Sequence, residues 1–112
     1  MQGITSAQLN YLKAKAFHDA VYSEYLERTK NLNFDEDFDK AFWKSEKIRE
    51  ELNLSEAERE LTEAEEELIK LLKEKVQNLP GYDDTIEKAF NARHLLNIRK
   101  ELVGLALNLR DE

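Results

Sequence analysis

Glycine and proline, the residues that most often interrupt helices, are almost absent from this chain. Between Gly3 and Pro80 the sequence contains neither of them. Their absence favours long uninterrupted helices. Apolar residues recur at helical spacing along the chain, and no stretch alternates as a strand does. The sequence therefore predicts an all-α protein.

The size and composition of the chain suit a single folded domain. Its 112 residues are enough for one hydrophobic core but leave no room for a second. Hydrophobic residues make up 41% and charged residues 37%, which favours a soluble globule over a disordered tail. The chain has no cysteine, which excludes disulfides, thiolate chemistry and cysteine-ligated zinc. We expect one helical-bundle domain over residues 1–112.

Neither a membrane span nor a secretory signal is evident. No segment approaches the ~18 unbroken apolar residues of a membrane-spanning helix. The N-terminus lacks a basic region followed by an apolar run. We therefore expect a cytoplasmic protein that does not enter a membrane.

Capping residues and helix stops divide the chain into four predicted helices. Short connections between consecutive helices favour antiparallel neighbours. We expect an antiparallel up-down bundle of four helices, three of them long and the second shorter. The predicted helices run from near Thr5 to about Thr29, from around Asp35 to Leu52, from Ser55 to the stop at Leu79-Pro80-Gly81, and from Asp83 or Asp84 to about Leu109.

The third helix has two possible starts. Ser55 with Glu58 has the spacing of a capping box, and Thr62 with Glu65 has it too. The nearly heptad apolar seam of this helix begins at Ala57. The earlier start is therefore favoured.

The chain is acidic along its whole length. It carries 24 acidic and 17 basic residues, a net charge of −7, and no region is strongly basic. Because a nucleic-acid interface neutralises phosphates over an extended face, we do not expect direct nucleic-acid binding. An acidic protein can instead meet a basic partner, including a nucleic-acid-binding protein.

The most acidic stretch lies in the third predicted helix, from Glu56 to Glu67. Its acidic start and basic end are the distribution that the helix dipole favours, so a solvated helix face explains it. Alternatively, this face docks on a basic protein. The chain would then be an inhibitor or adaptor that occupies a basic nucleic-acid-binding groove of its partner. The residues that would line this surface are Glu56, Glu60, Glu63 and Glu67.

Two carboxylate pairs flank the first predicted connection. Glu24 and Glu27 lie late in the first helix, and Glu36 and Asp39 lie early in the second. A short turn would bring the pairs together, and carboxylate oxygens are the ligands that Mg²⁺ and Mn²⁺ prefer. The pattern resembles the ExxE…ExxD signature of all-α nucleotide pyrophosphohydrolases of the MazG type. This resemblance implies a metal-dependent hydrolase, whereas the alternative is a set of surface acids.

The two histidines do not form a known metal motif. His18 and His94 both lack the glutamate three residues earlier that di-iron bundles use. His18 shares a helix face with Tyr11, Tyr22 and Tyr25. This cluster is either a polar packing group whose tips reach partners or water, or the lining of a ligand pocket.

Arg99 is the least expected choice in the fourth predicted helix. Its position falls inside a wide apolar arc, and an unpaired buried charge is costly. Either Arg99 extends along its apolar stem to a nearby glutamate, or it contacts a ligand or partner. The neighbours within the arc are Leu95, Leu102, Val103 and Ala106.

The same arc is broader than one neighbouring helix requires. Either this helix is the central helix of the bundle, or part of its surface meets another subunit. Leu105, Leu107 and Leu109 extend it to the end of the helix. If exposed, they would form an apolar patch typical of an interface. Because two-fold homodimers are the commonest closed assembly, we expect a dimer.

Trp43 lies away from the apolar stripe that Phe38, Phe42 and Ile48 form on the second helix. It either covers a neighbouring helix or anchors a partner, since tryptophan is enriched among binding hot spots. Eight of the ten aromatic residues fall between Tyr11 and Trp43. The first hairpin is therefore the expected place for a partner surface.

These features favour a non-enzymatic interaction protein that self-associates and binds another protein through helix faces. We expect no cofactor. The candidate interface residues are Trp43, Leu105, Leu109 and Arg99. The acidic adaptor and the metal-dependent nucleotide hydrolase remain the alternatives.

Overall fold

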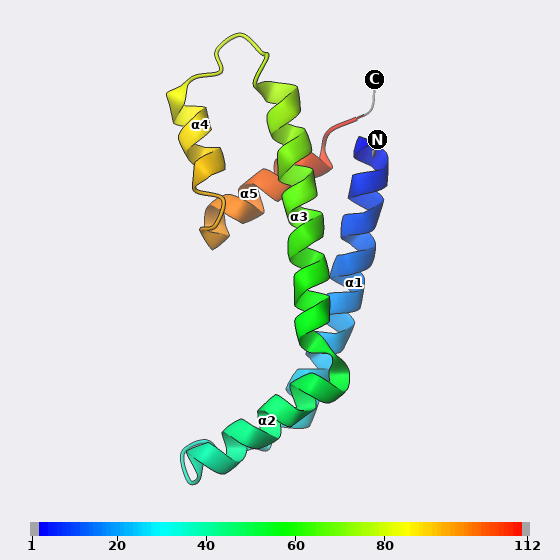
Figure 1. The fold of residues 1–112 in the computed structure, drawn as a ribbon, viewed down its shortest axis with the longest axis vertical. Coiled ribbons are helices and arrows are strands. Elements are labelled where there is room, and N and C mark those ends of the chain that lie inside the picture. Colours follow the sequence, from blue (N-terminus) through cyan, green and yellow to red (C-terminus); the bar gives the residue numbers. More distant parts are fainter. Residues whose placement is uncertain (1–2, 111–112) are drawn as a thin grey trace. The chain divides into compact units, whose positions relative to one another are not determined.

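A computed structural model describes residues 3–110 of the chain, and these residues form helices without any strand. The all-α class predicted from the sequence is confirmed. The helices are α1 (Ile4–Thr29), α2 (Phe38–Leu52), α3 (Leu54–Val76), α4 (Asp84–Asn91) and α5 (Leu96–Leu107), as shown in Figure 1.

The chain divides into two compact units. The central unit, Lys13–Thr62, contains most of α1, all of α2 and the first turns of α3. The terminal unit combines residues up to Leu12 with those from Glu63 onward. It contains the first turns of α1, most of α3, and both α4 and α5. That the whole chain is one domain stays a prediction.

The junction between α2 and α3 has no loop. Asn53 ends α2 in the left-handed conformation, with φ 56° and ψ 40°, and its backbone N–H donates to the carbonyls of Arg49 and Glu50. Helix α3 begins at the next residue, Leu54, which is fully buried with Ala57. The earlier of the two predicted starts of this helix is therefore the one that forms.

Helix α2 begins at Phe38, three residues later than predicted. Two side chains explain the delay. Asn33 Oδ1 accepts hydrogen bonds from the backbone amides of Asp35 and Glu36, at 3.1 Å each. These bonds form a turn before the helix. Asp37 then caps the helix, because its Oδ1 accepts the backbone N–H three residues later at 3.1 Å.

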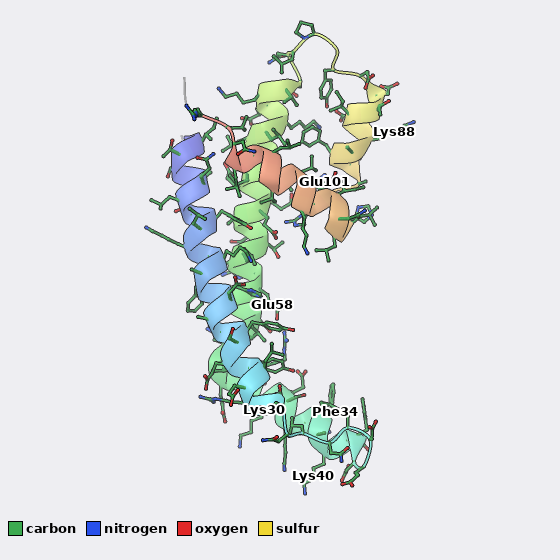
Figure 2. All side chains as sticks on the ribbon, turned by 180° about the vertical axis from the view of Figure 1, so that it is seen from behind. Lys30, Phe34, Lys40, Glu58, Lys88 and Glu101 are labelled. Atoms are coloured by element: carbon green, nitrogen blue, oxygen red, sulfur yellow. The ribbon has the colours of Figure 1, made fainter. Side chains whose placement is uncertain are left out.

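The connection between α1 and α2 runs along the first half of α2 instead of making a short turn, as Figure 2 shows near Phe34 and Lys40. Residues 31–33 of this connection and Ala41 of α2 line one small hollow. The second half of α2 meets the end of α1, where Arg28 Nη1 lies 3.6 Å from Glu51 Oε2. Among residues 3–110, the segment that lies along the first half of α2 is therefore this non-helical connection.

The prediction of a single fourth helix is wrong, because the helical conformation is interrupted between α4 and α5. Leu95 is extended, with φ −79° and ψ 128°, and cannot continue a helix. Phe90 is buried, and its carbonyl accepts a bond from the Arg93 side chain at 3.0 Å, which satisfies one of the groups at the end of α4.

This break changes the architecture of the terminal unit. Helix α4 runs back beside the end of α3, whereas α5 turns and crosses α3 obliquely (Figure 1). Residues 3–110 thus form five helices in place of the predicted four.

The core of the terminal unit is formed by ten apolar residues from four helices. By contrast, the central unit buries only small side chains and one leucine. In the terminal unit these residues are Ile4, Ala7, Tyr11, Leu68, Ile69, Leu72, Phe90, Leu102, Val103 and Ala106, and in the central unit they are Ala41, Ser45, Leu54 and Ala57. No helix within residues 3–110 has the length and apolarity that crossing a membrane requires.

Candidate interaction surfaces

Four aromatic rings form a continuous ladder on the central unit. Phe34 meets Phe38 edge-on at 5.9 Å between ring centroids, and Phe38 stacks on Phe42 at 6.0 Å. Phe42 then meets Trp43 edge-on at 5.6 Å. Both geometries are favoured for aromatic pairs. These four residues are called the aromatic surface below.

The aromatic surface is open to solvent. The exposed fractions are 40% for Phe34, 61% for Phe38, 39% for Phe42 and 69% for Trp43. The predicted apolar stripe of α2 is therefore buried only in part. Since no helix covers the first half of α2, rings at core-like spacing remain on the outside.

Trp43 does not cover a neighbouring helix, which was one of its two predicted roles. With 69% of its surface exposed, its one close ring neighbour among the described residues is Phe42, on its own helix. Tryptophan side chains that are this exposed leave a large apolar area in water. Its position agrees better with the second role, the anchoring of a partner.

The charges around Trp43 are mixed. The helical spacing of α2 places acids on one side of Trp43 and lysines on the other. A surface of both signs does not suit an extended run of phosphates. It does suit the polar rim of a protein interface. The acids are Asp39, Glu46 and Glu50, and the lysines are Lys40, Lys44 and Lys47.

The predicted cluster around His18 is a stack of rings. His18 lies parallel to Tyr22 at 5.8 Å, and Tyr22 stacks on Tyr25 at 6.1 Å. The Arg49 guanidinium lies 5.9 Å from the Tyr25 ring centroid. The fourth predicted member, Tyr11, is buried in the terminal unit. The contacts of His18, Tyr22 and Tyr25 agree with the first of the two predicted roles, a polar packing group.

Asp19, beside this stack, is held in its charged form. Hydrogen bonds from Lys15 and His18, at 3.1 and 3.2 Å, lower the pKa of its carboxyl group. The carboxylate next to His18 in the sequence therefore binds two side chains of its own helix.

The terminal unit carries an apolar groove of about 560 Å³, lined by fourteen residues from the end of α3, the following loop, α4 and α5. We call it the apolar groove. Large side chains along it remain exposed, including Leu79 at 56%, Ile86 at 37% and Leu105 at 57%. Leu105, predicted as an interface residue, therefore lies on an open apolar surface.

One of the fourteen lining residues is charged, namely Glu101 on α5. Tyr82, another lining residue, donates its hydroxyl hydrogen bond to Glu87, which also accepts from Lys73 Nζ at 3.0 Å. The bond to Glu87 raises the pKa of Tyr82 to about 12. Tyr82 therefore presents a neutral ring to the groove.

Leu109 differs from Leu105 in its surroundings. It is half-buried, and its carbonyl accepts a bond from Gln8 Nε2 at 2.9 Å. Gln8 Nε2 also lies 3.1 Å from the carbonyls of Ala106 and Leu107. The predicted patch of C-terminal leucines is therefore exposed mainly at Leu105, while the chain after α5 is tied to α1.

Arg99 pairs with glutamates of α3, the structural alternative of its two predicted roles. Its side chain is 13% exposed. Its Nε donates to Glu65 Oε1 at 3.1 Å, and its Nη1 donates to Glu66 Oε1 at 2.6 Å. Arg93 Nε also donates to Glu66, at 3.0 Å. These four residues are the Arg99 cluster.

The charges of the Arg99 cluster stabilise one another. The hydrogen bond from Arg99, followed by the one from Arg93, outweighs desolvation and lowers the pKa of Glu66. Burial works against the charged form of Arg99, but the bonds to Glu66 and Glu65 outweigh it and raise the pKa of the guanidinium. Two donor groups of Arg99 therefore bind carboxylates of the chain itself.

The predicted acidic surface is divided between the two units. Glu56 and Glu60 belong to the central unit, and Glu63 and Glu67 to the terminal unit. Glu56 is hydrogen-bonded to Arg59, which lowers the pKa of Glu56. Both Glu63 and Glu67 line a hollow of about 400 Å³ that also contains Lys70, Lys73 and Arg93, so that hollow is of mixed charge.

The four carboxylates of the hydrolase hypothesis do not come together. Within residues 3–110, no three acidic or histidine side chains are grouped as a metal site would need. Glu24 instead accepts from Arg28 at 2.9 Å, and Glu27 accepts from Lys30 at 2.6 Å. The path of residues 30–37 explains this, because it leads from the end of α1 near Lys30 along α2 past Phe34 (Figure 2).

The apolar groove was not predicted from the sequence. Its signal was present in the broad apolar arc of the last predicted helix, which is wider than one neighbour requires. Because the sequence predicts one continuous helix there, the arc indicates a dimer interface. The break before α5 instead directs Ile98, Leu102 and Leu105 toward α4 and the end of α3.

Comparison of the chain with protein-family models, with curated proteins and with solved structures finds no match.

Proposed function

We propose that this chain is a non-enzymatic interaction protein and that the aromatic surface of α2 docks on another protein chain. The observation that carries the proposal is the continuous ladder of exposed rings that ends at Trp43. Exposed rings are costly in water unless a partner covers them, and aromatic residues are enriched at the centres of protein interfaces.

The surroundings of the ladder support the same function. Charges of both signs on α2 would form a polar rim around an aromatic centre, the usual arrangement of an interface. The rings contact each other in the free chain, and α2, which carries three of them, is capped by Asp37, so the surface is formed before a partner binds.

Self-association belongs to the same proposal. A second copy of the chain is one candidate partner for the aromatic surface, because closed homodimers are the commonest assemblies. A dimer through this surface would cover Trp43 in both copies. A location in the cytoplasm is likewise proposed.

Site-specific photo-cross-linking tests the proposal in the cells that produce the protein. A benzophenone amino acid replaces Phe34 in one variant, which keeps Trp43, and Lys30 in a control variant. Both positions are exposed and lie in the central unit, but only the first belongs to the aromatic surface. The proposal expects a defined cross-linked product from position 34 and none from position 30.

The mass of the product identifies the partner. Twice the mass of the chain would mean that the surface joins two copies, and any other mass would mean a different protein. The same product must disappear when Phe38→Asp is added. Equal cross-linking from positions 34 and 30, or no product from position 34, would contradict docking at the aromatic surface.

The acidic adaptor makes a different prediction. Binding through Glu56, Glu60, Glu63 and Glu67 would weaken steeply with salt, whereas binding through rings would change little. Measuring the affinity of the identified partner at low and high salt separates the two functions.

A further inference from the structure

The apolar groove lies entirely within the terminal unit, whereas the aromatic surface belongs to the central unit. It is open, since Leu79, Ile86 and Leu105 each keep more than a third of their surface exposed. A small ligand in such a groove would leave much of this apolar area in water. A macromolecular segment would cover it.

The charge of the groove restricts that segment. Glu101 is the single charged residue of the lining, and no basic side chain lines the groove. Lys100 directly precedes Glu101 on α5, but the helical spacing directs it away from the lining face. Lys88 on α4, labelled with Glu101 in Figure 2, does not line the groove either. An acidic ligand would find no counter-charge there.

We infer that the apolar groove is a second docking site, which takes an amphipathic helix of a partner protein with a basic side chain opposite Glu101. Charge complementarity selects this occupant, because an apolar face matches the groove and a lysine or arginine matches its one charge. The groove volume of about 560 Å³ is enough for several large apolar side chains.

The inference does not rest on the aromatic surface. The two sites lie in different units, so one can fail while the other stands. Binding to the groove should therefore be unchanged in Trp43→Ala.

Two synthetic helical peptides test the inference. Both carry leucines at i, i+3, i+4 and i+7, and they differ only in one flanking position, which is lysine in one peptide and glutamate in the other. Affinity is measured by calorimetry, and the site is located from backbone amide resonances of the full chain. The expected result is that the lysine peptide binds about tenfold more tightly and shifts resonances of the groove residues.

Three variants of the chain complete the experiment. Glu101→Gln should make the affinities of the two peptides equal. Glu101→Lys should reverse the preference, so that the glutamate peptide binds more tightly. Glu74→Gln is the matched control, because Glu74 is an exposed acid of α3 outside the groove, and the order should be unchanged. Leu105→Asn should weaken both peptides about tenfold by removing exposed apolar contact area.

Several results would overturn the inference. They are failure of the lysine peptide to bind, equal affinity of the two peptides for the unmodified chain, and an effect of Glu74→Gln as large as that of Glu101→Gln. Shifts confined to residues outside the groove would overturn it as well.

Discussion

Nη1 of Arg99 lies 2.6 Å from Oε1 of Glu66, which joins α5 to α3 through a charge-assisted hydrogen bond. The guanidinium also reaches Glu65, and 13% of the Arg99 side chain is exposed. Because a break between α4 and α5 is needed for α5 to cross α3, this contact belongs to the arrangement that forms the apolar groove.

Arg99→Met should destabilise the fold. The substitution keeps the apolar stem but leaves Glu65, at 20% side-chain exposure, and Glu66 without their main partner. We expect a loss of about 2 kcal/mol in the free energy of unfolding, measured by chemical denaturation. The control is Lys30→Met, whose exposed pair with Glu27 should cost less than about 0.5 kcal/mol. Equal losses would mean that the Arg99 cluster does not stabilise the fold.

The pH dependence of stability should report the same contact. The pKa of Glu66 is lowered in the folded chain, chiefly by Arg99. Its stabilising contribution is therefore fully present above the unfolded-state pKa of about 4.3 and is lost as the pH falls through the lower folded-state value. Denaturation curves of the unmodified chain and Glu66→Gln should differ at neutral pH and converge in acid. A difference that persists unchanged in acid would contradict this.

Gln8→Ala should release the chain after α5 from α1. Gln8 Nε2 is the donor to the carbonyls of Ala106, Leu107 and Leu109. We expect a loss of about 1 kcal/mol and faster hydrogen exchange at the end of α5. Gln77→Ala, at an exposed glutamine after α3, is the matched control and should have little effect. Unchanged exchange in Gln8→Ala would exclude the proposed anchoring role.

Asn53 should tolerate glycine but not alanine. Its φ of 56° lies in the left-handed region, where a Cβ atom is costly and asparagine is among the better-tolerated side chains. Asn53→Gly should change the free energy of unfolding little, whereas Asn53→Ala should lower it by about 1 kcal/mol. Thermal melting distinguishes the two, and equal effects would mean that the conformation of residue 53 is not constrained.

The helices that the sequence predicts well are those with strong local signals. Helix α1 follows from its lack of glycine and proline, and the start of α3 lies close to the beginning of the apolar seam at Ala57. The start of α2 was displaced because Asn33 and Asp37 provide stronger local caps than Asp35 does. The break before α5 contains neither glycine nor proline. The contacts on either side of it are tertiary, because Phe90 is buried and Arg99 binds α3, and local sequence patterns do not predict such contacts.

The candidate site was predicted in part. The residue type of Trp43 indicated a partner anchor, and Leu105 indicated an apolar surface. The ladder of Phe34, Phe38 and Phe42 has the same spacing as a core-facing stripe, and spacing alone does not show what covers a helix. The path of residues 30–37 determines that, and it depends on turn contacts of Asn33 that periodicity does not include.

The affinity of the cross-linked partner for Trp43→Ala is the most direct test of the proposed function. Trp43 is mostly exposed in the free chain, so its removal should leave the helical spectrum and the melting temperature nearly unchanged. As the anchor of the interface it should contribute at least about 2 kcal/mol, a loss of about thirtyfold in affinity. An affinity equal to that of the unmodified chain would contradict docking through the aromatic surface.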